Sequence, residues 1–179
     1  MPSGRPPSEE GERGAQVLGV LRTLARHEVR FVLIGGQAAV ARGSPLLTRD
    51  VDICYARDDE NLGRLAGALR ALGASLRGAP SDLPFQLDAA ALRAGDSFTF
   101  DTSAGPLDCL GTPAGTTGFE DLATDATELD LGGFTVRVAS VEDLMRMKRA
   151  AGRRKDRVAL EWLGALRDEL DQSDGGERA

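Results

Sequence analysis

The sequence predicts an α+β fold, in which strands and helices mix without a strict strand–helix–strand repeat. Short apolar runs of strand length alternate with longer segments that carry apolar residues at helical spacing. Two pairs of short runs are each separated by a glycine-containing turn, as in β-hairpins. The 179 residues are 41% hydrophobic and 28% charged, which is ordinary composition for a globular domain.

The first half of the chain is expected to alternate helices and strands. Apolar residues at helical spacing mark two helices, and two apolar runs of strand length lie between them. The Gly35-Gly36 pair stops the first strand, and a short helix is expected to start directly after this turn. In chain order the expected elements are helix 14–28, strand 31–34, helix 37–42, strand 51–55 and helix 60–72.

The second half is expected to contain two hairpins followed by two helices. Residues 78–85 include two prolines and are expected to form a loop. The turns of the hairpins are 103–106 and Gly132-Gly133, and Ser140 opens a helix with a capping box. In chain order the expected elements are helix 88–93, strands 98–102 and 107–110, strands 126–131 and 134–139, and helices 140–151 and 155–170.

The expected organisation is one domain over 14–172 between disordered tails at 1–13 and 173–179. No apolar run is long enough to cross a bilayer, and the two cysteines, in apolar stretches, favour a reducing compartment. A cytoplasmic protein without a membrane partner is therefore expected. A net charge of −6 argues against nonspecific coating of nucleic acid, and a single histidine argues against sites with several imidazole ligands.

Three aspartates on two strands carry the clearest chemical signal. Asp50 and Asp52 are two residues apart on an expected strand, so their side chains project from the same face. If strand 107–110 lies antiparallel beside strand 51–55, Asp108 completes a group of three carboxylates. Hard oxygen ligands of this kind suit Mg²⁺ or Mn²⁺, which take the rest of their coordination from water and substrate phosphates.

Three segments around these residues resemble the signatures of the polymerase-β-type nucleotidyltransferase superfamily. They are Val32–Gly36, Thr48–Ile53 and Leu107–Leu110. The C-terminal segments Val141–Lys148 and Gly152–Asp156 are most similar to the small bacterial AbiEii-like group, which includes toxins of toxin–antitoxin systems. The resemblance implies a mixed β-sheet flanked by helices, with a helical C-terminal part.

The resemblance also implies roles for individual residues. Gly35 and Gly36 would contact the phosphates of a nucleoside triphosphate such as ATP, and Asp50, Asp52 and Asp108 would bind the metal. Asp108 would in addition help to deprotonate the acceptor. Lys148 is expected to act in catalysis by compensating phosphate charge. The residues expected to help bind the nucleotide are Thr48, Arg49, Lys148, Arg153 and Lys155.

A basic cluster over residues 146–157 admits two interpretations. It contains seven basic residues and one acid, and both lysines of the chain, Lys148 and Lys155, lie within it. The cluster would stabilise a triphosphate or dock an RNA backbone. The alternative is a solvated helix face, which is equally consistent with the arginines taken one by one.

The function predicted from these observations is metal-dependent transfer of a nucleoside monophosphate from an NTP to an acceptor hydroxyl. A tRNA 3′ end or a protein would be the acceptor, and the protein would be a toxin with a cognate antitoxin. One alternative is transfer to a small molecule such as an antibiotic. Another is a degenerate fold that binds a nucleotide or protein without chemistry. An RNA-binding protein without chemistry is the weakest, because aromatic residues for base stacking make up only 4% of the chain.

Overall fold

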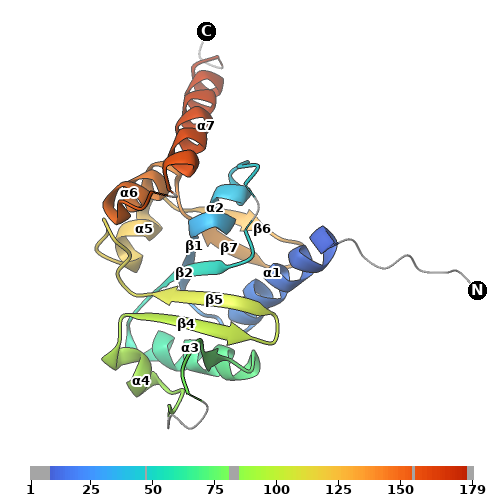
Figure 1. Ribbon diagram of the computed structural model, residues 1–179, viewed down its shortest axis with the longest axis vertical. Helices are drawn as coiled ribbons and strands as arrows, with labels where there is room; N and C mark the ends of the chain where they lie inside the picture. Colours follow the sequence, from blue (N-terminus) through green and yellow to red (C-terminus); the bar gives the residue numbers. More distant parts are fainter. Residues whose placement is uncertain (1–8, 47, 81–84, 155, 177–179) are drawn as a thin grey trace, which may run out of the picture.

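The computed structural model describes residues 9–46, 48–80, 85–154 and 156–176. Strands and helices mix as expected for an α+β protein (Figure 1). The helices are α1 (Glu9–Arg26), α2 (Gly35–Ala41), α3 (Asp59–Ala71), α4 (Ala89–Ala94), α5 (Phe119–Asp125), α6 (Val141–Ala151) and α7 (Asp156–Gly176). The strands are β1 (Phe31–Ile34), β2 (Val51–Tyr55), β3 (Ser75–Leu76), β4 (Ser97–Thr102), β5 (Gly105–Leu110), β6 (Thr127–Asp130) and β7 (Thr135–Val138).

All seven of these strands form one mixed sheet in the order β3-β4-β5-β2-β1-β7-β6. The β2–β5 and β1–β7 pairs are parallel, and the other pairs are antiparallel. Both predicted hairpins are present, as β4–β5 and β6–β7. The prediction of a mixed sheet flanked by helices is therefore confirmed.

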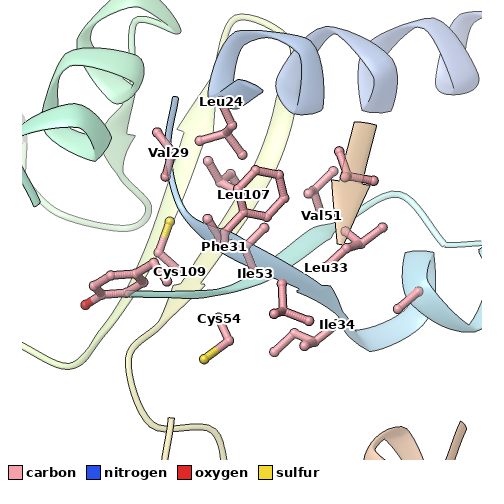
Figure 2. Close-up of a cluster of buried hydrophobic side chains, with 14 of the residues drawn as sticks. Leu24, Val29, Phe31, Leu33, Ile34, Val51, Ile53, Cys54, Leu107 and Cys109 are labelled. Atoms are coloured by element: carbon pink, nitrogen blue, oxygen red, sulfur yellow. The ribbon is translucent and has the colours of Figure 1, made fainter. Parts of the chain in front are cut away.

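The sheet has one face against the main core and another that carries polar groups. Figure 2 shows Val51, Ile53 and Leu107 on the side of the sheet where Leu24 of α1 packs. Cys54 lies on the opposite side in the same view. Because side chains alternate along a strand, Asp52 shares the face of Cys54, and its neighbours Val51 and Ile53 anchor the strand in the core.

Two elements of the sheet and its surroundings are absent from the sequence prediction. β3 has only two residues and forms the edge of the sheet beside β4, so its pairing depends on tertiary contacts. α5 buries Phe119 and Leu122, which are three residues apart as one helix face requires, but its seven residues follow a glycine-rich loop. Both elements are too short for a periodic signal to stand out.

The terminal helices are longer than expected. α1 begins at Glu9 rather than at residue 14, and an ion pair four residues apart, between Arg13 and Glu9 at 2.8 Å, supports this additional turn. α7 continues to Gly176, and the Ser173 hydroxyl donates to the carbonyl of Glu169 at 2.9 Å. Residues 9–13 and 173–176 are thus helical, within the segments expected to be tails.

The two C-terminal helices are separated by a break at Gly152. Gly152 ends α6 in a left-handed conformation with φ of 61°, and α7 starts at Asp156. α7 packs mainly on α6, buries Leu163 and extends away from the sheet (Figure 1). Lys155 and the central part of the expected loop, 81–84, lie outside the described residues. Within the described parts of the chain, no helix has the length and apolar character needed to cross a membrane.

Candidate active site

Asp52 and Asp108 lie directly opposite each other on neighbouring strands. The expectation that strand 107–110 runs antiparallel to strand 51–55 is wrong, because β5 is parallel to β2. The register nevertheless pairs Asp52 with Asp108 and Val51 with Leu107. Paired residues of neighbouring strands project from the same face, so the two carboxylates are brought together as the triad prediction required. Asp50 precedes the first residue of β2 and is half-buried.

The two paired carboxylates are under electrostatic strain. Burial, followed by the nearby charges of Asp108 and Asp50, raises the pKa of Asp52 to about 7. Asp108 has a buried Oδ1 atom without a hydrogen-bond partner in the described part of the chain. A buried carboxylate oxygen without a partner is unfavourable unless a cation or a donor reaches it. The pair is therefore suited to receive positive charge.

The expected group of three carboxylates is assembled only in part. No group of three or more His, Cys, Asp or Glu side chains among the described residues is placed so that it could hold a metal ion. Asp50 affects Asp52 through its charge. The pair Asp52 and Asp108 still fits a magnesium or manganese ion, because such ions need only one or two protein carboxylates and complete their coordination with water and phosphate oxygens.

Gly35 allows Asp52 to pack against the turn after β1. A Cβ atom on Gly35 would lie 2.7 Å from Cγ and 2.9 Å from Cβ of Asp52, closer than real atoms approach. Gly35 also has a φ of 67°, a conformation that other residues rarely adopt. The diglycine turn and the carboxylate of β2 therefore fit together only when residue 35 lacks a side chain. In the same way, a Cβ atom on Gly36 would collide with the side chain of Thr48.

Lys148 lies at the same site as Asp52, at the edge of the packed face of α6. Both line a cavity of about 190 Å³, and Asp156 lies beside them. Lys148 Nζ is 3.2 Å from Asp156 Oδ1, and both side chains are largely buried. The other residues that line this cavity are Ile34, Gly35, Leu110, Pro113, Ala114, Leu144, Met147, Ala151 and Arg153. Its walls thus combine an apolar lining with two cations and two carboxylates.

The remaining basic residues divide into those at the cavity and those away from it. Arg153 is exposed and lines the cavity. Arg146 instead forms an ion pair with Asp143 of its own helix at 2.7 Å and one with Asp121 at 3.0 Å, which ties α6 to α5. Arg49 is exposed in the segment before β2 and does not line this cavity. The basic cluster is therefore not one continuous phosphate-binding surface.

Asp156 is the residue of this site that sequence reasoning missed. It appears in the sequence only as the single acid of the basic cluster, a pattern typical of a solvated helix end. The break at Gly152 turns the chain so that Asp156 is buried beside Lys148. Its spacing of eight residues from Lys148 gave no signal, because the contact depends on the angle between α6 and α7.

Larger cavities lie away from these carboxylates. One of about 460 Å³ is lined by Ser75, Leu87 and apolar residues near the edge of the sheet, without a charged group. Another of about 350 Å³ contains Arg30, whose guanidinium group already pairs with Asp58 at 3.0 Å and Glu120 at 2.8 Å. Neither is lined by a carboxylate that is paired in register with another on the neighbouring strand, as Asp52 is with Asp108, so the smaller cavity beside Asp52 is the better candidate active site.

The raised pKa of Asp52 predicts how stability depends on pH. Unfolding returns this pKa from about 7 to its ordinary value of 3.8, so the wild type loses stability as the pH rises from about 4 to about 7. Asp52→Asn removes this penalty. We expect the stability gained by the variant to grow by about 2–4 kcal/mol over this range, measured by urea unfolding in metal-free buffer. A gain that is the same at pH 4 and pH 8 would contradict the raised pKa.

Gly35→Ala is expected to destabilise the protein. A side chain at this position is strained by the positive φ and collides with Asp52, so the free energy of unfolding should fall by about 1–3 kcal/mol. Gly63→Ala is the control, because Gly63 lies in α3 with nothing near its Cβ position. Alanine favours a helix more than glycine does, so this variant should be slightly more stable than the wild type. Thermal unfolding of both variants measures this difference. A Gly35→Ala variant as stable as the wild type would show that the turn can rearrange.

No family model and no curated protein gives a significant match to this chain. Solved structures with a similar fold include nucleotidyltransferases. The lincomycin-bound lincosamide antibiotic adenylyltransferase LnuA is 15% identical with a TM-score of 0.57, and the match covers 89% of this chain and 98% of LnuA. The antibiotic-resistance factor ANT(2″)-Ia in solution is 15% identical with a TM-score of 0.55, and the match covers 94% of this chain and 96% of the other.

A crystal structure of ANT(2″)-Ia in complex with adenylyl-2″-tobramycin is similar in the same way. It is 18% identical with a TM-score of 0.53, and the match covers 87% of this chain and 89% of the other. These identities are low, so the likeness concerns the fold, and it extends over almost the whole length of each chain. The chain therefore has the nucleotidyltransferase fold.

Proposed function

We propose that this protein transfers a nucleoside monophosphate from a nucleoside triphosphate to an acceptor hydroxyl. The observation that carries the proposal is the Asp52–Asp108 pair, in register beside the Gly35 turn of a nucleotidyltransferase fold. The unpaired buried Oδ1 of Asp108 and the raised pKa of Asp52 support it, because a cation bound between these carboxylates would relieve both.

Each charged group has a distinct part in the proposed reaction. The acceptor oxygen forms a bond to the α-phosphorus while the bond from that phosphorus to the bridging oxygen breaks, and pyrophosphate leaves with the electron pair. Asp108 accepts the proton of the acceptor hydroxyl. A divalent cation held by Asp52 and Asp108, with Asp50 nearby, would neutralise charge on the phosphates. Lys148 and Arg153 compensate the charge on the leaving pyrophosphate.

The cavity beside Asp52 supports a position for the donor nucleotide. Its apolar lining suits an uncharged part of the nucleotide, and its cations suit the phosphates. In this proposal the phosphates contact the backbone of Gly35 and Gly36, whose missing side chains leave room for Asp52 and Thr48. Thr48 and Arg49, in the segment just before β2, also help to bind the nucleotide. Lys155 is proposed from its position in the sequence alone, as a residue that helps to bind the nucleotide and whose loss would act mainly on acceptor binding.

Two classes of acceptor are compatible with this chemistry. A small-molecule hydroxyl is favoured by similarity over nearly the full length to LnuA with lincomycin and to ANT(2″)-Ia with adenylyl-2″-tobramycin. A tRNA 3′ end or a protein acceptor, with a toxin role and a cognate antitoxin, rests on the resemblance of the segments Val141–Lys148 and Gly152–Asp156 to the AbiEii-like group.

The proposal is tested with each of the four α-³²P-labelled ribonucleoside triphosphates and Mg²⁺ or Mn²⁺. The acceptor pools are total RNA, a protein extract, and a panel of aminoglycosides and lincosamides. We expect label in one pool with the wild type and none with Asp108→Asn. Label in a small molecule would identify an antibiotic-type transferase, and label in RNA or protein would favour the toxin. Nucleotide binding without label in any pool would instead indicate the degenerate binding module.

A further inference from the structure

Thr48 occupies the space that a side chain on residue 36 would fill. A Cβ atom built on Gly36 would lie 2.8 Å from Cγ2, 2.9 Å from Cβ and 3.1 Å from Oγ1 of Thr48. Real Cβ atoms essentially never approach other heavy atoms within 3.0 Å. Residues 36 and 48 therefore cannot both carry a side chain in this arrangement of the backbone. The side chain of Thr48 fills the space between them.

The backbone conformation gives no reason for a glycine at position 36. Gly35 has a φ of 67°, but Gly36 is not among the described glycines with positive φ. Alanine or serine would be compatible with such a backbone. The missing side chain at residue 36 thus makes room for Thr48, just as the missing side chain at residue 35 makes room for Asp52.

Thr48 is fixed in place, but its hydroxyl is not used by the protein. Gln37 of α2 donates a hydrogen bond from Nε2 to the backbone carbonyl of Thr48 at 3.0 Å, which holds the segment before β2 against the turn. In the described part of the chain the Thr48 hydroxyl makes no hydrogen bond. The side chain is half-buried, so this hydroxyl is both positioned and available to a ligand.

We infer that the Thr48 hydroxyl donates a hydrogen bond to the triphosphate of the donor nucleotide. It acts at the diglycine turn in the place of a side chain on residue 36, on the same turn that Asp52 contacts through Gly35. This inference rests on the proposed function, because it requires a nucleotide with its phosphates at this turn. Thr48 is then a substrate-binding residue whose hydroxyl is held in position by its packing on Gly36.

The first test compares three residues at position 48. Thr48→Val keeps the branched shape that packs on Gly36 and removes the hydroxyl, whereas Thr48→Ser keeps the hydroxyl. We expect Thr48→Val to bind nucleoside triphosphates about tenfold more weakly in the presence of Mg²⁺, measured by calorimetry, and Thr48→Ser to bind as the wild type does. The loss should be equal for every triphosphate that the wild type binds, because the contact is to phosphate. Thermal unfolding of Thr48→Val should be unchanged.

The second test moves the hydroxyl from residue 48 to residue 36. The double variant Gly36→Ser/Thr48→Gly is compared with Gly36→Ala/Thr48→Gly, which has the same backbone changes and differs by one oxygen atom. We expect the serine variant to bind triphosphates about tenfold more tightly than the alanine variant. This comparison separates the contribution of the hydroxyl from the flexibility that a glycine at position 48 introduces.

The possible results distinguish this inference from the proposed function. Equal affinity of Thr48→Val and the wild type would overturn the role of the hydroxyl and leave nucleotidyl transfer standing. A wild type that binds none of the four triphosphates with Mg²⁺ would overturn both. Weaker binding by Thr48→Val, together with the difference between the two double variants, would support the hydroxyl as a phosphate ligand.

Discussion

Asp52→Asn is expected to abolish nucleotidyl transfer while the protein stays folded. Asp52 is one of the two carboxylates brought together on β2 and β5, and a neutral amide is a poor ligand for Mg²⁺. The substitution also relieves repulsion from Asp108 and Asp50, so the free energy of unfolding should hold or rise. Transfer is measured with purified protein and labelled triphosphate, and folding is checked by circular dichroism and thermal unfolding.

Asp101→Asn is a matched control for this variant. Asp101 is an exposed carboxylate of β4 and pairs with Arg77 at 2.9 Å, and it does not line the cavity beside Asp52. Its loss should leave transfer near the wild-type rate, since exposed ion pairs contribute little. Retained transfer in Asp52→Asn would contradict the carboxylate mechanism. A comparable loss in Asp101→Asn would show that the effect reflects overall surface charge.

Lys148→Ala is expected to slow transfer by about 100- to 1000-fold, a typical loss for one charge-stabilising group. Lys148 lines the same cavity as Asp52 and is held by Asp156 at 3.2 Å, so its ammonium group is kept near the site where pyrophosphate charge develops. Removing the lysine also leaves the buried carboxylate of Asp156 without its ion-pair partner. Its negative charge would then be uncompensated at a site proposed to bind phosphates. Rates at saturating triphosphate and acceptor measure the effect on the chemical step.

Two other substitutions serve as controls for Lys148. Arg149 is exposed on the same helix, and Arg149→Ala should transfer at nearly the wild-type rate. Lys155→Ala should have a smaller effect than Lys148→Ala, mainly on the binding of acceptor, because the helix that carries Lys148, α6, ends at Ala151. If Lys148→Ala and Lys155→Ala both lowered the transfer rate equally and only mildly, Lys148 would have no special role in catalysis and would act as one basic residue among several.

Much of the fold followed from local patterns in the sequence. The apolar run of β1, the alternation in β2 and the glycine turns of the two hairpins each predicted an element that the structure contains. Ser140 predicted the start of α6, where its hydroxyl accepts from the backbone N–H of Asp143. These signals depend on residues close in sequence, so the periodicity and the turns are enough to reveal them.

The features that depend on distant contacts did not follow from the sequence. The spacing of Asp50 and Asp52 predicted two carboxylates on one face, but it gave no direction for β5, which carries Asp108 and depends on the connection through α3, β3, α4 and β4. The burial of Asp156 beside Lys148 depends on the break at Gly152, and the contact of Thr48 with Gly36 depends on how the segment before β2 folds back. Such contacts are set by packing rather than by local preference.

The position of the transferred phosphorus tests the central claim most directly. The wild type is incubated with the combined acceptor pools and either α-³²P- or γ-³²P-labelled triphosphate, and both the acceptor and the released phosphate are analysed. Transfer of a nucleoside monophosphate predicts that the α-label appears on the acceptor and the γ-label in pyrophosphate, and that Asp52→Asn gives neither. A γ-label on the acceptor, or its release as orthophosphate, would contradict the proposed chemistry.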